Sequence, residues 1–295
     1  ADVDIETVNA VLEEGGKFAS EVLFPLNVSG DTEGCSLDPA SHAVTTPKGF
    51  KEAYASYVAG GWAALSCDTA FGGQGLPLVV NQMFYEMLNS ANQAWTMYPG
   101  LTHGAYECLH AHGTREQQAL FLPKLTSGEW TATMCLTESH CGTDLGLLRT
   151  KAEPQADGSY KLTGNKIFIS SGDHDFVSNI VHLVLARLPD APAGSKGISL
   201  FVVSKHLLDA QGQLGALNGI FCSGIEHKMG IHGSPTCTMI FGEDAPAVGE
   251  LLGEHLLEIR AGGAGERRVL VVEAPLDVAS AAACVRSMCR ARPSA

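Results

Sequence analysis

The sequence has no long apolar run, no paired-cysteine motif and few charged residues, and each absence narrows the class of protein. A membrane-spanning helix needs roughly 20 consecutive apolar residues, and no run approaches that length, so we expect no membrane span. The nine cysteines are scattered, and none of them forms a CxxC pair. An odd number of cysteines without a framework predicts reduced thiols in a reducing compartment.

Charged residues make up 17% of the chain, whereas an average globular protein has about 25%. The formal net charge is −13, which argues against nucleic acid and against an anionic membrane surface as partners. A low charge content fits a surface that other chains partly cover. We therefore expect a homo-oligomer or a subunit of a larger assembly.

The spacing of apolar residues changes at Gly128. Before it, apolar residues recur at helical spacing, and Thr114 with Gln117 has the form of a capping box. After it, short β-rich segments alternate with turns. Helices that precede strands predict an α+β fold. Helices are expected at residues 4–26, 46–60, 76–90, 99–112 and 114–122, a loop at 27–44, and strands at 130–137, 147–152, 160–163, 166–170, 179–186, 197–203 and 236–241.

This pattern predicts two domains and a tail. An N-terminal α-helical domain is expected at residues 1–125, followed by an antiparallel β-barrel or β-sandwich domain at 126–243. The chain of 295 residues, 45% of them hydrophobic, is long enough for two such cores. Residues 244–295 are rich in Ala and Arg, with no lysine after Lys228, and form a divergent tail.

A polar turn follows the strand-like run that ends at Thr137, and Gly142 lies within it beside Thr143. Such a turn directs backbone N–H groups toward one place, and a glycine allows a ligand to approach the backbone closely. On local chemistry alone, an ordinary loop at a strand end fits equally well. In the same way, the residues Phe168 to Ser170 alone indicate no more than a buried strand.

Several motifs resemble those of the acyl-CoA dehydrogenase family and occur in the same order along the chain as in that family. They are Thr137-Glu138, Gly142-Thr143-Asp144, Thr150-Lys151-Ala152 and the run LTGNKIFIS at 162–170. The resemblance covers roughly residues 4–254, and segments 71–77, 98–106 and 226–233 are most similar to a subgroup that includes 3-methylmercaptopropionyl-CoA dehydrogenases. It implies a helical domain, a flavin-binding β-domain and a C-terminal helical bundle. Nothing after Glu254 resembles that bundle, which we expect to be missing.

The resemblance implies an FAD site in the β-domain. Thr137 would hold the pyrimidine edge of the flavin, and Thr143 would contact a pyrophosphate oxygen and lie near the acyl thioester. Phe168 would pack on the flavin ring, and the Ser170 hydroxyl would donate to flavin N5. The implied cofactor-binding residues are Met134, Leu136, Thr137, Gly142, Thr143, Phe168, Ile169 and Ser170, with Thr143 also binding substrate.

The family reaction is the FAD-dependent α,β-dehydrogenation of an acyl-CoA thioester in fatty acid metabolism, with an electron-transfer flavoprotein as the oxidant of the flavin. It would place this chain in the mitochondrial matrix or the bacterial cytoplasm. The catalytic base of the family is a Glu in the second helical domain, and no matching segment is recognisable, so no catalytic residue is assigned. Three alternatives stay open: a fragment of a dehydrogenase, a non-catalytic structural subunit of a larger complex, and a flavin-binding module that supplies half a site to another chain.

A metal site is the alternative that the histidines suggest. His103, Cys108, His110 and His112 lie close together in the sequence, but their spacing is not a known zinc pattern. We therefore predict no metal. The turn at 226–233, which contains His227 and His232, is expected to be structural.

Overall fold

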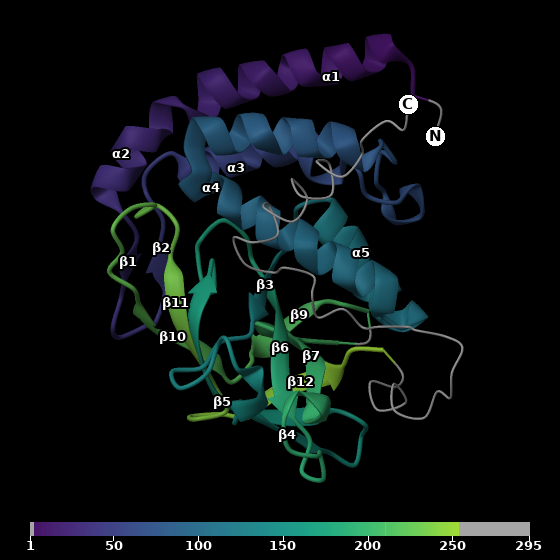
Figure 1. The fold of residues 1–295 in the computed structure, drawn as a ribbon, viewed down its shortest axis with the longest axis vertical. Helices are drawn as coiled ribbons and strands as arrows, with labels where there is room; N and C mark the ends of the chain where they lie inside the picture. The colour runs from purple at the N-terminus through teal and green to yellow at the C-terminus, as the bar shows by residue number, and fades with distance from the viewer. Residues whose placement is uncertain (1–2, 210, 254–295) are drawn as a thin grey trace, which may run out of the picture. The chain divides into compact units, whose positions relative to one another are not determined.

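The computed structural model describes residues 3–209 and 211–253. The α-helices precede the strands of the main sheet, so the predicted α+β fold class with an N-terminal helical domain is confirmed (Figure 1). The predicted tail lies outside the described residues from position 254 onward. None of the described helices combines the length and the apolar character needed to cross a membrane.

The first helical segment is longer than its sequence predicts. Helix α1 (Ile5–Lys17) begins where the Asp4 carboxylate accepts a hydrogen bond from the Thr7 N–H at 2.7 Å. A π-helical turn (Phe18–Leu23) leads into α2 (Pro25–Glu33). The predicted loop is therefore wrong as far as Glu33, because this stretch packs on α3 and α4 in spite of its polar composition.

Helices α3 (Phe50–Ala59) and α4 (Leu78–His112) form the centre of the helical domain. The two helices predicted at 76–90 and 99–112 are one helix with a kink at Asn92. The side-chain oxygen of Asn92 accepts a hydrogen bond from the backbone N–H of Trp95 at 3.1 Å. The predicted capping box is confirmed at the start of α5 (Arg115–Thr126). Fully buried aromatic side chains of this core are Phe50, Tyr57, Phe84, Trp95 and Tyr98.

The β-domain contains a sheet of eight strands in the order β10-β11-β5-β12-β7-β6-β3. Strand β4 pairs with both β5 and β6, so β5, β12, β7, β6 and β4 close on themselves as a barrel does. The bounds are β3 (Thr131–Cys135), β4 (Lys151–Pro154), β5 (Tyr160–Ser170), β6 (Ile180–Arg187), β7 (Ile198–Ser204), β10 (Ile220–Ile225), β11 (Thr236–Phe241) and β12 (Ala247–Leu251). The sheet thus continues past residue 243, the predicted end of the β-domain.

The pairing of β3 differs from the antiparallel prediction, because β3 runs parallel to β6. All five residues of β3 are buried. Helix α4 packs along the edge of β3 that does not pair with β6, where the Ala132 N–H donates to Thr102 Oγ1 at 3.1 Å. Because side chains alternate along a strand, five buried residues in a row mean that both faces are covered. Burial on both faces is typical of parallel strands. Two small hairpins lie outside the main sheet: β1 (Ser36–Leu37) with β2 (Val44–Thr45), and β8 (His206–Leu208) with β9 (Leu214–Leu217).

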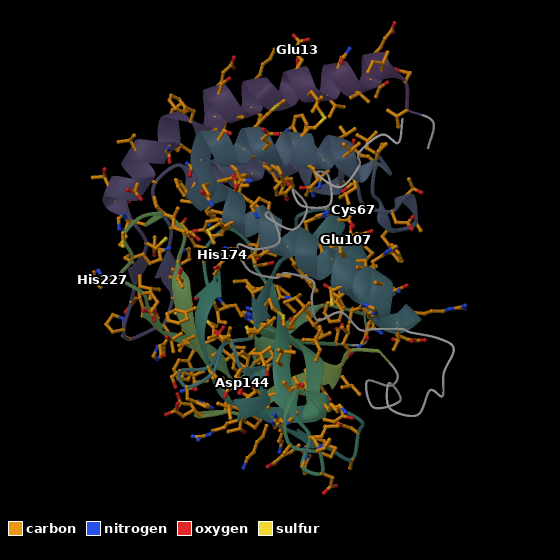
Figure 2. All side chains as sticks on the ribbon, viewed as in Figure 1. Glu13, Cys67, Glu107, Asp144, His174 and His227 are labelled. Carbon is orange, nitrogen blue, oxygen red and sulfur yellow. The ribbon has the colours of Figure 1, made fainter. Side chains whose placement is uncertain are left out.

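Two histidines are buried against β3. His174 Nε2 lies 2.9 Å from Thr131 Oγ1, and His182 Nδ1 lies 2.8 Å from Thr133 Oγ1. Burial, with the positive charge of Lys205 adding to it, lowers the pKa of each imidazole to about 3. Both rings are therefore neutral in the folded chain near neutral pH. Figure 2 shows His174 where α4 and the sheet meet.

These histidines predict a loss of stability in mild acid. An unfolded His has a pKa of about 6.5, so the unfolded chain binds more protons below that pH than the folded chain does. The free energy of unfolding should be fully retained above about pH 6.5 and should fall as the pH approaches 3, by on the order of 1–2 kcal/mol per His at about pH 5. Urea denaturation of wild type and His182→Gln at a series of pH values measures this dependence.

The His182→Gln variant should show a shallower dependence than wild type. His227 is exposed and projects from the surface in Figure 2, so His227→Gln serves as the control and should retain the wild-type slope. Equal slopes for wild type and His182→Gln would contradict the assignment of acid sensitivity to the buried ring.

Candidate functional site

The turn after β3 is closed by its own backbone. The Glu138 N–H donates to the Cys141 carbonyl at 2.8 Å, and the Cys141 N–H donates to the Glu138 carbonyl at 3.0 Å. Ser139 and His140 are thereby exposed at the tip. The turn is also held to β5, because the Thr137 carbonyl accepts from the Ile167 N–H at 2.9 Å.

Gly142 lies directly against Thr137. A Cβ atom at position 142 would lie 3.0 Å from Thr137 Cγ2, so a larger residue would require the Thr137 side chain to shift. Within residues 3–209 and 211–253, the backbone N–H groups of Thr137, Gly142 and Thr143 donate to no protein acceptor. Thr143 is exposed and Thr137 and Gly142 are half-buried, so these donors are available to a ligand.

Phe168 lies at an irregularity in β5. The register with β11 shifts between Cys237, which pairs with Ile169, and Met239, which pairs with Lys166. At this bulge Phe168 has a φ of +60°, which is rare for an aromatic residue, and its side chain is 57% exposed. A bulge therefore turns a large aromatic ring outward on the strand that packs beside the turn.

The other predicted site residues divide between the surface and the core. Ser170 is half-buried and pairs with Thr236, whereas the Ile169 side chain is only 1% exposed and belongs to the core. Met134 is buried and Leu136 is half-buried. Any role of Ile169 at a ligand must therefore come from its backbone.

Glu138 and Lys166 form a buried ion pair between the turn and β5. Lys166 Nζ lies 2.9 Å from Glu138 Oε1 and donates to the Leu136 carbonyl at 3.1 Å. The Thr150 hydroxyl donates to the same carboxylate oxygen at 2.6 Å, its N–H donates at 3.0 Å, and the Arg149 N–H donates to Oε2 at 2.8 Å. Every polar atom of this pair has a partner, as buried charges require.

The surroundings fix the charge of both groups. Burial alone would raise the pKa of Glu138, but hydrogen bonds from Thr150 and Lys166 outweigh it and lower the pKa to about 2. Burial lowers the pKa of Lys166, and the Glu138 carboxylate opposes this effect. Glu138 is therefore a carboxylate at any pH near neutral and a very weak base.

Glu138, His140 and Cys141 bring three metal-ligand atoms within 4.8 Å of one another. The His140 nitrogen and both Glu138 oxygens already take part in hydrogen bonds. His140 Nε2 lies 3.0 Å from the Leu147 carbonyl, which requires a proton on that nitrogen, and both Glu138 oxygens accept hydrogen bonds. We assign this group to the structure of the turn. The histidines weighed earlier lie elsewhere, on α4, where His103 Nε2 is 3.6 Å from Glu107 and His110 Nε2 is 3.2 Å from Asp68.

Two family models match the chain. One, described as the acyl-CoA dehydrogenase N-terminal domain, matches residues 36–129. The other, described as the acyl-CoA dehydrogenase middle domain, matches residues 133–243 and includes the turn and Phe168. Through these two domains, the chain belongs to the acyl-CoA dehydrogenase family. The resemblance seen in the sequence is confirmed.

Individual relatives agree with this family. The chain is 44% identical over 255 residues to a 3-methylmercaptopropionyl-CoA dehydrogenase of Ruegeria pomeroyi, covering 86% of this chain and 42% of the relative. It is 38% identical over 286 residues to a butyryl-CoA dehydrogenase of Syntrophomonas wolfei, covering 96% and 47%. The chain thus spans less than half the length of these two curated relatives. The solved structure of an acyl-CoA dehydrogenase from Bacillus anthracis, complexed with FAD, matches with a TM-score of 0.65 and 25% identity over 86% of this chain and 38% of that chain.

Sequence reasoning gave no role to Glu138, Lys166 or Thr150, although all three lie in the motifs that carry the family resemblance. A signal was present in β5, where Lys166 keeps the period-two alternation of the buried Leu162. A lysine in an inward position of a buried strand requires a partner. The sequence alone does not identify Glu138 as that partner, because the two residues are 28 positions apart.

The strained Phe168 predicts an unusual mutational result. Glycine adopts a positive φ without strain, and Phe168 buries little area, so Phe168→Gly should lower the free energy of unfolding by less than about 1 kcal/mol. Phe201 is fully buried, and Phe201→Ala should cost about 3–5 kcal/mol. Denaturant unfolding of both variants tests the contrast, and comparable losses would show that the Phe168 ring is a core side chain.

Proposed function

We propose that this chain binds FAD through the turn after β3 and the bulge of β5, and that it contributes the flavin-binding side of an acyl-CoA dehydrogenase. The observation that carries the proposal is Phe168. A half-exposed aromatic ring at a strained backbone position costs free energy, and such outliers cluster at ligand sites. The match to a family member complexed with FAD supports the choice of ligand.

The residues present fit a flavin. Thr137, Gly142 and Thr143 offer free N–H donors for the pyrimidine edge and the pyrophosphate, and the flat Phe168 ring suits an aromatic face. The Ser170 hydroxyl has no partner within the described part of the chain, so it can donate toward a ligand nitrogen. Met134 and Leu136 would flank the ring. Bound FAD supplies the hydride acceptor for the α,β-dehydrogenation of a thioester.

The substrate that we propose is an acyl-CoA thioester, because the named relatives act on acyl-CoA compounds. Thr143, which is exposed beside Gly142, would contact it. The proposed oxidant of the flavin is an electron-transfer flavoprotein, and the proposed compartment is the bacterial cytoplasm or the mitochondrial matrix. A bacterial relative and a relative whose name includes the word mitochondrial are both among the matches.

The carboxylate of the turn does not serve as the base in this proposal. Removal of the α-proton needs a basic group with free lone pairs near the substrate. Glu138 is 3% exposed, is paired with Lys166, and has a pKa of about 2. Asp144 uses its carboxylate to cap the Gly146 N–H at 3.0 Å. We infer that the base must come from outside residues 3–253.

A binding experiment tests the cofactor. FAD added to the purified chain should be quenched in fluorescence on binding, and most of it should be lost on desalting, because the described site covers only one face of the flavin. Gly142→Val should weaken binding, since the added side chain would require Thr137 to shift. Gly158→Val, in an exposed turn with nothing within 4 Å of a Cβ, is a control for binding once its lower stability is taken into account. Flavin retained stoichiometrically after desalting would contradict weak binding.

A turnover assay tests the proposed division of labour. The chain alone should show little or no reduction of an artificial electron acceptor with a panel of acyl-CoAs, because a positioned base typically contributes on the order of 10²–10⁴-fold. Turnover comparable to that of ordinary family members would reveal a base among the described residues, with the exposed Glu226 the first to mutate. If FAD binding and turnover are both absent, the chain is better described as a structural subunit.

A further inference from the structure

Lys166 joins the two segments of the proposed flavin site. Its side chain is fully buried, and its ammonium group reaches the Leu136 carbonyl at 3.1 Å and Glu138 Oε1 at 2.9 Å. Leu136 precedes Thr137, and Lys166 lies two residues before Phe168. A single side chain therefore ties the backbone on which the turn begins to the strand that carries the exposed ring.

The third member of the network enters because Gly164 makes room for it. A Cβ atom at position 164 would lie 2.5 Å from Thr150 Oγ1 and 2.9 Å from its Cα, so only glycine allows this approach. Thr150 then reaches Glu138 with both its hydroxyl and its N–H. The turn, the start of β4 and the middle of β5 are thus held at one carboxylate.

We propose that Glu138 and Lys166 are positioning residues for the flavin, which hold the turn in its binding shape and balance charge beneath the flavin edge. This inference rests on the proposed function and adds that the ion pair controls the affinity for flavin. The pair is neutral as a whole. Removal of one partner leaves a single charge of known sign near Thr137, where the pyrimidine edge would lie.

The effect of the pair's charges on flavin affinity can be distinguished from the effect of a loosened turn. Reduced flavin carries more negative charge at its pyrimidine edge than oxidised flavin does. Lys166→Met leaves the Glu138 anion, so the ratio of affinities for reduced and oxidised FAD should fall by about tenfold. Glu138→Gln removes the anion, so the same ratio should rise, by up to about tenfold where Lys166 keeps its proton without its partner. A change in packing alone would change this affinity ratio in the same direction in both variants.

The first experiment needs no flavin. Amide hydrogen exchange in the wild-type chain is compared with exchange in Thr150→Val, which removes one hydrogen bond to Glu138 and keeps both charges. Exchange of the Glu138 and Cys141 amides, which bond across the turn, should accelerate at least severalfold in Thr150→Val, with β6 and β7 unchanged, and Thr150→Ser should restore the wild-type rate. Unchanged exchange in the turn would overturn the positioning role, whether or not FAD binds.

The second experiment measures dissociation constants of oxidised and reduced FAD for wild type, Lys166→Met and Glu138→Gln, each checked for a folded β-domain by circular dichroism. Lys205→Met is the matched control, because Lys205 also pairs with a carboxylate, that of Asp173, in the same domain. Opposite changes of the affinity ratio in the two pair variants support the inference, and changes of one sign overturn it. If the wild-type chain binds no FAD, the proposed function is refuted. If the wild-type chain binds FAD and both variants keep the wild-type affinity ratio, only the proposed role of the ion pair is refuted.

Discussion

The buried ion pair of Glu138 and Lys166 is the constraint on which the arrangement of the site depends. Two opposite charges removed from water must find each other and fill their remaining hydrogen-bonding positions, or the fold loses several kcal/mol. This requirement fixes the end of β3, the start of β4 and the middle of β5 together. Features that look independent, such as the closed turn and the glycine at position 164, meet at the same carboxylate.

Elements set by local chemistry could be predicted from the sequence. The capping box of Thr114 and Gln117 specifies the start of α5 through hydrogen bonds between near neighbours, and the structure contains it. The start of α3 shows where this reasoning stops. The helix predicted to begin at residue 46 begins at Phe50, after the left-handed Gly49, and the Thr46 hydroxyl donates to Asp175 at 2.7 Å instead. The partner lies far along the chain, where no local pattern identifies it.

A period-two pattern could not predict that the Phe168 ring is exposed. Regular alternation from Leu162 through Lys166 would place Phe168 inward as well. The bulge between these residues inserts one position, so that Phe168 turns outward and Ile169 enters the core. A bulge is decided by pairing with β11, whose residues lie about 70 positions later. The parallel pairing of β3 with β6 is equally non-local, because it depends on burial of both faces of β3.

The place of β12 in the sheet affects how the chain folds. Residues 247–251 form the last strand in the described part of the chain, yet they pair with β5 on one side and β7 on the other. During synthesis from the N-terminus, β5 and β7 therefore leave the ribosome well before the strand that belongs between them. Until Leu251 emerges, these two strands present unpaired edges, which are prone to pair with other chains. The nascent β-domain should thus depend on chaperones more than the helical domain, whose helices all precede the strands of the main sheet in the sequence.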